Sequence, residues 1–484
     1  MSQQGFSWPV AFDPVTRTWV GRDSPAAVLV PELAGQLVCD ESSLRWAAED
    51  FGHAVHRRPR AVLRPGGVAD VAAIVEFAGK TGLSVAARGS GHSTYGQAQT
   101  NGGIVIDMAK LNLVSDVRAD RVTAQAGARW SDVLDATLAA GRTPAVLTDY
   151  LGTSVGGTLS VGGAGGTSHQ HGFQVDSVEE LSVVTGTGRL VTCSLRQNRR
   201  LFDATRAGLG QCGIIVSATL RVIPAASRVR RYRLQYRDLT TFLAAQHHLI
   251  NHGKFDFVQG QIFPAAPGVW QYLLEAALYY MPPGTPVDAT RIDGQDYGTI
   301  ADEIDDISYR DFAHRMAPGE AALRDSGEWS YPHAWLTVVL PSAATASLVG
   351  EILARLTAAE LGQSGLVLLY PIRTDRLHTL LTRSPDSKLA WLFALLRTAS
   401  VDNPADVAAM IEANRVVHDR AVACGGVTYP INSVPMSAAD WRIHFGPRWR
   451  QLQAAKEEFD PHGILTPGYG IGTHSAPHCP KPIG

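Results

Sequence analysis

The chain has 484 residues, with 43 Lys and Arg, 45 Asp and Glu, and a formal net charge of −2. This length is typical of two or three domains, and a hydrophobic fraction of 45% provides a large core. Balanced charge without a Lys or Arg run argues against nucleic acid or an anionic membrane as a partner, and no apolar run approaches the roughly 20 residues that span a bilayer.

The cysteines bear on the metal content and the compartment. The five cysteines are Cys39, Cys193, Cys212, Cys424 and Cys479. They show no Cys-x-x-Cys spacing and are odd in number, which argues against a structural zinc site and a disulfide framework. The sequence also begins without a charged segment followed by an apolar one, so no signal peptide is expected. These features predict a cytoplasmic protein.

The first half of the chain alternates between strand and helix patterns. After a polar lead-in over 1–58, which contains a predicted helix over 42–53, apolar runs and helical spacing follow each other. The predicted strands are 61–65, 83–87, 103–107, 121–126, 178–184 and 189–193, and the predicted helices are 68–78 and 131–140.

Three glycine-rich segments interrupt this pattern. They are 88–97 (RGSGHSTYGQ), 152–172 and 208–215. Small residues let backbone N–H groups approach a ligand closely, so each segment could hold a phosphate or lie against a flat cofactor. An ordinary strand-to-loop turn with a surface His92 is the alternative for the first segment, and a structureless linker is the alternative for the second.

The second half of the chain has a different character. Residues 226–440 contain fewer glycines, more aromatic residues and alternating runs such as 269–276, which predict an antiparallel sheet covered by helices. Helices are predicted over 343–361, 388–397 and 405–424. A last helix over 441–459 is followed by a rigid turn over 460–468.

Eight motifs resemble the vanillyl-alcohol oxidase family, and cytokinin dehydrogenases within it. They are ARGSGHSTYGQ (87–97), GGIVIDMAKLN (102–112), LTDYLGTSVGGTLS (147–160), HGFQVDSVEELSVVTGTGRLVTCS (171–194), LFDATRAGLGQCGII (201–215), PHAWLTVVLPSA (332–343), DWRIHFG (440–446) and FDPHGILTPG (459–468). The resemblance implies an α+β, two-domain flavoenzyme. Its FAD-binding domain would be split between 1–225 and 440–484, and a substrate-binding domain with an antiparallel sheet covered by helices would occupy 226–439.

The resemblance also implies FAD, joined covalently to His92. The glycine-rich stretch 162–166 contains no Cys, so we expect one covalent link at most. The residues expected to bind the cofactor are Arg88, Gly89, Ser90, Gly91, His92, Ser93, Gln97, Thr148, Asp149, Tyr150, Ser154, Gly156, Gly157, Ser160, Gly163, Gly210, Gly213, Ile214, Ile215 and Tyr469.

Asp149 is the expected catalytic residue. Taken alone, an Asp at this place is more typical of a turn or a cap. In the family that the chain resembles, the Asp of the Thr-Asp-Tyr-Leu motif accepts a hydrogen bond from a substrate amine. Hydride then leaves the adjacent carbon for the flavin, and water hydrolyses the imine. Oxygen or another acceptor would take the electrons.

Four departures from the family pattern leave the substrate open: Gly162, Gln170, His314 and Glu328. They motivate an alternative, oxidation of an alcohol, a sugar or a secondary-metabolite intermediate. A flavin-binding protein without catalysis is a third hypothesis, against which the presence of both His92 and Asp149 argues.

Other side chains are open to two interpretations. Tyr370, Arg373, Trp391 and Phe393 could shape a substrate pocket, although a core role is favoured for the last two and a surface role is equally compatible with Arg373. His169 and His171 have no third ligand at suitable spacing, so no metal is expected. His444 is expected to be structural.

Overall fold

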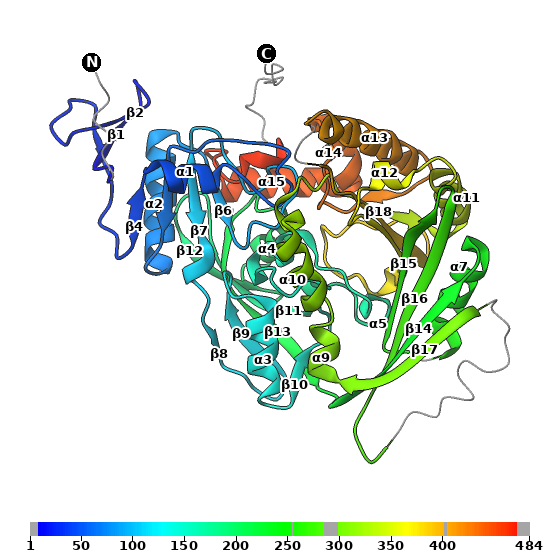
Figure 1. Cartoon of the computed structure of the whole chain (residues 1–484). Helices are drawn as coiled ribbons and strands as arrows, with labels where there is room; N and C mark the ends of the chain where they lie inside the picture. The colour runs from blue at the N-terminus through cyan, green and yellow to red at the C-terminus, as the bar shows by residue number, and fades with distance from the viewer. Residues whose placement is uncertain (1–7, 254, 285–298, 401–403, 472–484) are drawn as a thin grey trace.

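The N-terminal part of the molecule is built on a four-stranded sheet with the strand order β4-β5-β7-β6. The computed structural model of the chain describes residues 8–253, 255–284, 299–400 and 404–471. The strands are β4 (Gln36–Val38), β5 (Ala61–Arg64), β6 (Val85–Arg88) and β7 (Ile104–Asp107). Both β5 and β6 pair with β7 in parallel, because helix α2 (Val68–Thr81) carries the chain back between them. In Figure 1, α2 lies to the left of β6 and β7.

A six-stranded sheet follows and shares its core with the first sheet. Its strands are β8 (Val114–Ser115), β9 (Arg121–Gln125), β10 (Arg142–Pro144), β11 (Val178–Val184), β12 (Leu190–Ser194) and β13 (Ile214–Pro224). The helices beside it are α3 (Trp130–Leu138) and α4 (Val155–Val161). Alternate residues of β13 are buried, which fits a sheet with one covered face.

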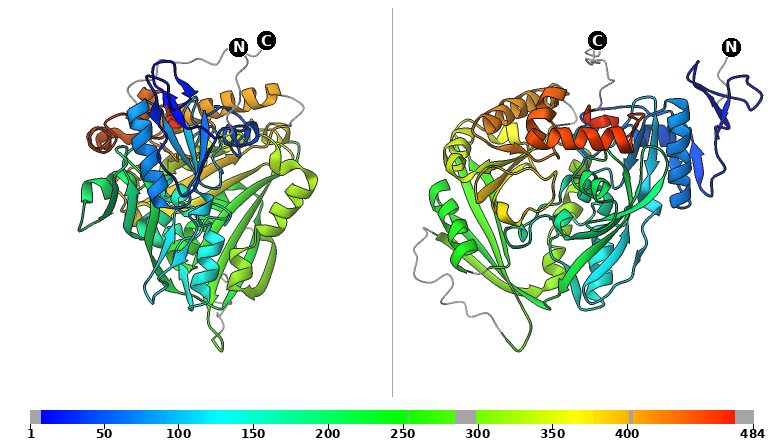
Figure 2. Two further views of the ribbon diagram at one scale, coloured as in Figure 1. Left: turned by 90° about the vertical axis from the view of Figure 1, so that its left-hand side faces the viewer. Right: turned by 180° about the vertical axis from the view of Figure 1, so that it is seen from behind.

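The second half of the chain forms one eight-stranded antiparallel sheet. Its strands are β14 (Arg228–Tyr236), β15 (Phe257–Ala266), β16 (Val269–Tyr280), β17 (Thr299–Ser308), β18 (Leu336–Pro341), β19 (Leu366–Arg373), β20 (Leu389–Leu396) and β21 (Val427–Thr428). Helices α7 (Leu239–His248), α11 (Ser342–Leu353) and α13 (Pro404–Ala423) cover it, and they bury a second apolar core. Figure 2 shows these helices on the outer side of the sheet. The α+β class and the two-part architecture expected from the sequence are confirmed.

One predicted element is wrong, because the predicted helix over 388–397 is strand β20. The run Leu-Ala-Trp-Leu-Phe-Ala-Leu-Leu is apolar at every position, so its periodicity does not separate helix from strand. Both faces of β20 are buried, and eight residues fit a strand better than a helix. Trp391 and Phe393 are core residues, but they belong to the sheet.

Other boundaries differ by a few residues or by a break. The predicted helix over 42–53 is α1 (Glu41–Ala47), and the one over 343–361 divides into α11 and α12 (Ala358–Leu361). The segment 152–172 is not a structureless linker, since it contains α4 and α5 (Ser168–His171).

The C-terminal residues return to the first half of the molecule through α14 (Ala438–Phe445) and α15 (Trp449–Phe459), which pack against α6 (Arg199–Thr205). The predicted helix over 441–459 is interrupted by Gly446 and Pro447, because Gly446 has a positive φ of 49°. The final described residues lie beside β6, where Val85 N–H donates to Ile464 O at 2.8 Å. Among the described helices, none combines the length and the apolar character that crossing a bilayer requires.

Candidate active site

A cavity that is partly open to solvent lies between the glycine-rich segments of the first half. Of the predicted cofactor residues, its wall contains Gly89, Ser90, Gly91, His92, Ser93, Gln97, Ser154, Gly156, Gly157, Ser160, Gly210, Gly213, Ile214, Ile215 and Tyr469. The wall also contains residues that the sequence does not single out: Ala87, Ala98, Met108, Ala126, Thr153, Thr158, Val161, Leu209, Pro430, Ile431 and Thr466.

The turn after β6 presents free donors to this cavity. Within the described part of the chain, the backbone N–H groups of Ser90, Gly91, His92 and Ser93 donate to no acceptor. Backbone donors in folded proteins nearly always have a partner, so this turn fits a ligand rich in acceptor oxygens. A cofactor with a pyrophosphate, such as FAD, meets that requirement.

The walls of the cavity approach each other closely at glycines. A Cβ atom on Gly89 would lie 1.9 Å from Ser154 Oγ, at the start of α4. Gly210 has φ +68°, and a Cβ atom there would lie 2.6 Å from Thr466 Oγ1. Thus the glycines let separate segments of the chain meet around the cavity.

Asp50 holds the turn in place through hydrogen bonds, and no motif in the sequence indicates this role. Its carboxylate accepts hydrogen bonds from Gly96 N–H at 2.6 Å, Gly52 N–H at 3.1 Å and Ser93 Oγ at 3.1 Å. Burial raises the pKa of Asp50 to about 6, and these hydrogen bonds oppose the shift only in part.

A crossing segment, defined here as residues 429–437, closes another side of the cavity. It runs from the end of β21 to the start of α14, and Pro430 and Ile431 belong to the cavity wall. The second half of the chain therefore contributes directly to this cavity, which the glycine motifs alone do not indicate.

Hydrogen bonds tie the crossing segment to the first half. Gly163 N–H donates to Tyr429 Oη at 2.8 Å, and Gln97 Nε2 donates to the backbone oxygen of Asn432 at 2.9 Å. Burial raises the pKa of Tyr429 to about 12, so its hydroxyl is neutral at ordinary pH. Gly163 is thus a support for the crossing segment and not part of the cavity wall.

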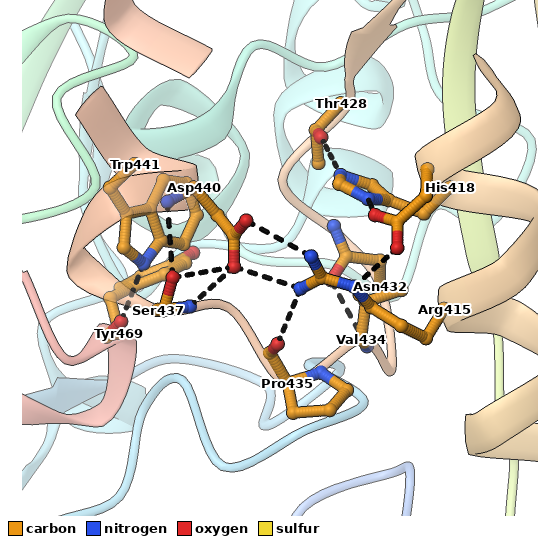
Figure 3. A network of polar contacts seen from close by, with 11 residues as sticks. Arg415, His418, Thr428, Asn432, Val434, Pro435, Ser437, Asp440, Trp441 and Tyr469 are labelled. Carbon is orange, nitrogen blue, oxygen red and sulfur yellow. Dashed lines mark hydrogen bonds and ion pairs between the residues drawn. The ribbon is translucent and has the colours of Figure 1, made fainter. Parts of the chain in front are cut away.

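Arg415 on α13 fixes the far end of the crossing segment (Figure 3). Its guanidinium donates to Asp440 Oδ2 at 2.8 Å, to Asp440 Oδ1 at 3.1 Å and to Pro435 O at 3.2 Å. Burial opposes ionisation of Asp440, but hydrogen bonds from Arg415 and Ser437 outweigh it and lower the pKa of this carboxyl to about 2. The ion pair links α13 to the first turn of α14.

His92 lies in a group of aromatic rings at the edge of the cavity. Its ring centroid is 4.1 Å from that of Phe51, 4.7 Å from that of Tyr150 and 5.5 Å from that of Trp335. Trp329 packs on both Phe51 and Tyr150, with centroid distances of 5.0 and 5.3 Å. These rings restrict the orientation of the imidazole and cover part of it, since His92 is half-buried.

The imidazole of His92 is uncharged at neutral pH. Burial, with the nearby His333 and Arg324, lowers the pKa of His92 to about 3. A neutral ring retains a nitrogen lone pair and can act as a nucleophile.

Asp149 is placed by a tight turn next to these rings. Thr148 Oγ1 and Thr153 Oγ1 both donate to Tyr150 O at 3.1 Å, which closes the turn. The Asp149 side chain is 25% exposed, and Gln259 Nε2 donates to its Oδ2 at 2.7 Å. A second donor, Arg315 in the turn that follows α9 (Tyr309–Ala313), contacts Oδ1. Neither Gln259 nor Arg315 is singled out by the sequence.

Five of the predicted cofactor residues lie outside the cavity wall: Arg88, Thr148, Asp149, Tyr150 and Gly163. Arg88 turns away, since its guanidinium lies 4.4 Å from the ring of Trp46 and donates to Glu49 O. Tyr150 is adjacent through its contact with His92.

His169, Gln170 and Arg373, which the sequence also drew attention to, interact with groups other than Asp149 and the cavity wall. Both ring nitrogens of His169 lie 3.0 Å from backbone oxygens, those of Gly166 and Phe255. Gln170 Nε2 also donates to Phe255 O, at 2.7 Å. Arg373 pairs with the exposed Asp375 at 3.2 Å. Within the residues that the structure covers, no cluster of three or more His, Cys, Asp or Glu is arranged to hold a metal ion.

Two of the departures from the family pattern, and also His444 and Tyr370, have buried polar atoms. His314 Nε2 and Glu328 Oε2 are buried without a hydrogen-bond partner among the described residues. His444 is buried at 8% exposure, and burial lowers its pKa to about 3. Tyr370 is buried, and burial with the nearby Asp149 raises its pKa well above the ordinary value.

Comparison with known proteins agrees with this geometry. A family model described as an FAD binding domain matches residues 59–194, and one described as cytokinin dehydrogenase 1, FAD and cytokinin binding, matches residues 268–472. Cytokinin dehydrogenase 10 of Oryza sativa subsp. japonica is 34% identical over 495 residues, covering 91% of this chain and 89% of that protein. The chain belongs to the cytokinin dehydrogenase family. Its members are FAD-linked oxidoreductases, and this chain is therefore an FAD-dependent enzyme.

Other members of this family, and more distant folds, extend the comparison. Cytokinin dehydrogenase 2 of Arabidopsis thaliana is 33% identical over 473 residues, covering 90% of this chain and 93% of that protein. An uncharacterized oxidoreductase in the fasciation locus of Rhodococcoides fascians is 46% identical over 430 residues, covering 89% of this chain and 97% of that protein. The structure of a chitooligosaccharide oxidase, 18% identical with a TM-score of 0.72, covers 92% of this chain and 98% of its own. The structure of the xylooligosaccharide oxidase of Myceliophthora thermophila C1 is 19% identical with a TM-score of 0.69. It covers 88% of this chain and 94% of its own. At these identities the last two show the fold alone.

Proposed function

We propose that this enzyme oxidises a cytokinin or a closely similar secondary amine at the carbon next to the nitrogen, forming an imine that water hydrolyses. The observation that carries the proposal is Asp149, a carboxylate held by two donors in the residue directly before Tyr150, whose ring contacts that of His92. When bound, FAD supplies the two-electron acceptor for the hydride.

Asp149 has a defined role in this proposal. Its carboxylate accepts a hydrogen bond from the substrate N–H, which orients the nitrogen lone pair and stabilises the positive charge that grows on nitrogen as hydride leaves. The partial exposure of Asp149 leaves its oxygens within reach of a ligand. Phe51, Tyr150, Trp329 and Trp335 form an apolar boundary that suits a flat heteroaromatic group.

The replacement Asp149→Ala tests this role. We expect turnover to fall by roughly 100-fold or more, which is the usual scale for a group of this kind. The measurement is the anaerobic reduction of the purified flavoprotein by isopentenyladenine, followed in the visible spectrum. Turnover unchanged from the parent enzyme would remove Asp149 from the mechanism.

The parent enzyme decides the substrate class in the same experiment. Bleaching of the oxidised flavin by isopentenyladenine supports the amine reaction. A yellow protein that dithionite reduces, but isopentenyladenine does not, would sink this reaction and point to an alcohol, a sugar or a secondary-metabolite intermediate.

We also propose that FAD is joined covalently to His92. The neutral imidazole in the cavity wall is the nucleophile that such a bond needs. After denaturation in SDS, the parent protein should keep flavin fluorescence on the gel, and His92→Ala should lose it. His333→Ala is the matched control, since it removes a nearby buried imidazole outside the cavity wall. Free flavin released from the denatured parent protein would exclude the bond.

We also propose that the domains divide at 225/226 and 439/440, and that the protein is cytoplasmic. The domain division follows the change from the six-stranded to the eight-stranded sheet and the start of α14. Among the described residues Cys193, Cys212 and Cys424 are free thiols, which is compatible with a reducing compartment.

A further inference from the structure

Both oxygens of Asp149 are engaged by side chains from the second half of the chain. Gln259 Nε2 donates to Oδ2 at 2.7 Å, and the Arg315 guanidinium donates to Oδ1. The guanidinium also lies 3.4 Å from Gln259 Oε1, so the three side chains form a closed ring of contacts. This ring assigns the orientation of the amide, with its NH₂ group toward the carboxylate.

Arg315 is itself held firmly on its other side. Its Nε donates to Glu275 Oε2 at 2.9 Å, and its guanidinium lies over the rings of Phe257 and Phe312 at 4.6 and 5.0 Å. The side chain is 9% exposed. Burial disfavours the charged guanidinium, but Glu275 and Asp149 outweigh it and raise the pKa of Arg315. The residue is therefore a permanent cation beside Asp149.

The other groups that face this cation set the local charge. From Glu275 the network continues to Arg231 at 3.8 Å, and Arg231 pairs with Asp305 at 2.5 Å on the side open to solvent. Tyr279 and Tyr370 also face the network, and burial raises the pKa of each well above its usual value, so both are neutral. Arg315 is thus the only charged donor that the described residues provide to Asp149.

We propose that Arg315 and Gln259 are positioning residues for the amine oxidation, which keep the Asp149 carboxylate ionised and aimed. The inference rests on the proposed function. Both residues act through Asp149: the guanidinium supplies the charge, and the neutral amide fixes the second oxygen without adding a competing proton acceptor. In this arrangement Asp149 offers its remaining lone pairs to a substrate N–H.

The charge balance explains why both residues matter. Without the guanidinium, the carboxyl groups of Asp149 and Glu275 would share a poorly solvated site and lose the cation between them, which favours uptake of a proton by the pair. A protonated Asp149 donates a hydrogen bond instead of accepting one. A carboxyl in place of the Gln259 amide would have the same effect, because two adjacent carboxylates repel each other.

The first experiment compares the pH dependence of kcat/KM for Arg315→Met, Gln259→Glu and the parent enzyme. We expect the acid limb to move to higher pH by about one unit or more in both variants, since loss of a cation and gain of an anion both favour protonation. Activity should recover at alkaline pH. Arg310→Met is the control, because Arg310 lies on α9, just before the turn that contains Arg315, but pairs with the exposed Asp135. A uniform loss of activity, equal at every pH, would assign Arg315 and Gln259 a structural role only and overturn the proposal.

The second experiment does not depend on the reaction. It measures the unfolding midpoint against pH for the parent, Asp149→Asn, Arg315→Met and the double variant. Acidification should stabilise Arg315→Met relative to the parent, and Asp149→Asn should abolish most of that difference. If all four profiles run parallel, the proposal fails even when turnover is normal. If isopentenyladenine is not oxidised but the profiles differ as expected, the proposed reaction fails and the ionisation of Asp149 by Arg315 stands.

Arg315→Met could unfold the protein, because it leaves two carboxyls buried. In that case both measurements are made on Gln259→Glu alone. This replacement keeps the size of the side chain and the Arg315–Glu275 pair. An unshifted acid limb together with an unchanged stability profile in Gln259→Glu would overturn the proposal.

Discussion

Gly89 shows how one missing side chain shapes the cofactor cavity. The turn after β6 passes so close to the start of α4 that a Cβ atom on Gly89 would overlap Ser154 Oγ. The following residues, whose N–H groups have no partner among the described residues, keep their place in the cavity wall only while the two segments remain at this distance. The geometry of the turn therefore depends on a residue that makes no side-chain contact of its own.

The replacement Gly89→Ala tests this dependence. We expect the purified protein to contain several-fold less FAD, because either the turn or α4 must move to relieve the overlap. The ratio of flavin to protein absorbance measures the loading. Gly21→Ala is the control, since a Cβ atom there would have no neighbour within 4 Å. Equal loading of both variants with the parent would show that the turn tolerates the shift.

The sequence predicts some residues of the site well and others not at all. Gly89 to Ser93 stand out because a glycine-rich turn after a strand has a local signature. Asp50, Gln259 and Arg315 have none, since each reaches the site from a distant element and looks like an ordinary polar residue in its own segment. Their roles follow from tertiary contacts, which a single sequence does not contain.

At the scale of elements, segments whose apolar residues recur with one clear period are predicted correctly. Segments that are apolar at every position are not. Helix α13 was expected over 405–424 and occupies Pro404–Ala423. Strand β20 was expected to be a helix, because a sheet covered on both faces demands apolar residues at every position and so erases the alternation. The choice between the two is made by β18 and β19, which pair with β20 on either side.

Helices α13 and α14 provide the element-scale prediction, because Arg415 joins them beside the crossing segment. Arg415→Met should lower the free energy of unfolding by about 1–2 kcal/mol, since Asp440 is only 13% exposed and keeps its charge without its main partner. Urea unfolding followed by circular dichroism measures the change.

Arg420→Met is the control for this variant. Arg420 lies on the same helix and pairs with Glu351, which is 53% exposed, so its loss should cost less than about 0.5 kcal/mol. Equal destabilisation by the two replacements would mean that the link to α14 contributes nothing beyond an exposed ion pair.

At the scale of the whole molecule, the two halves were predictable and their interdependence was not. The change from glycine-rich to aromatic sequence near residue 226 matches the change from the six-stranded to the eight-stranded sheet. The crossing segment and Asp149 break this simple division. Pro430 and Ile431 reach the cofactor cavity from the second half, and Asp149 in the first half receives its hydrogen bonds from Gln259 and Arg315 in the second.

The order of the cavity wall along the chain has a consequence for how the enzyme is made. The wall begins at Ala87 and is completed only by Thr466 and Tyr469, which lie far along the chain. A nascent chain on the ribosome therefore cannot close this cavity until residues 466–469 have left the exit tunnel. If the cavity holds FAD as proposed, we expect a polypeptide that stops before residue 466 to be colourless.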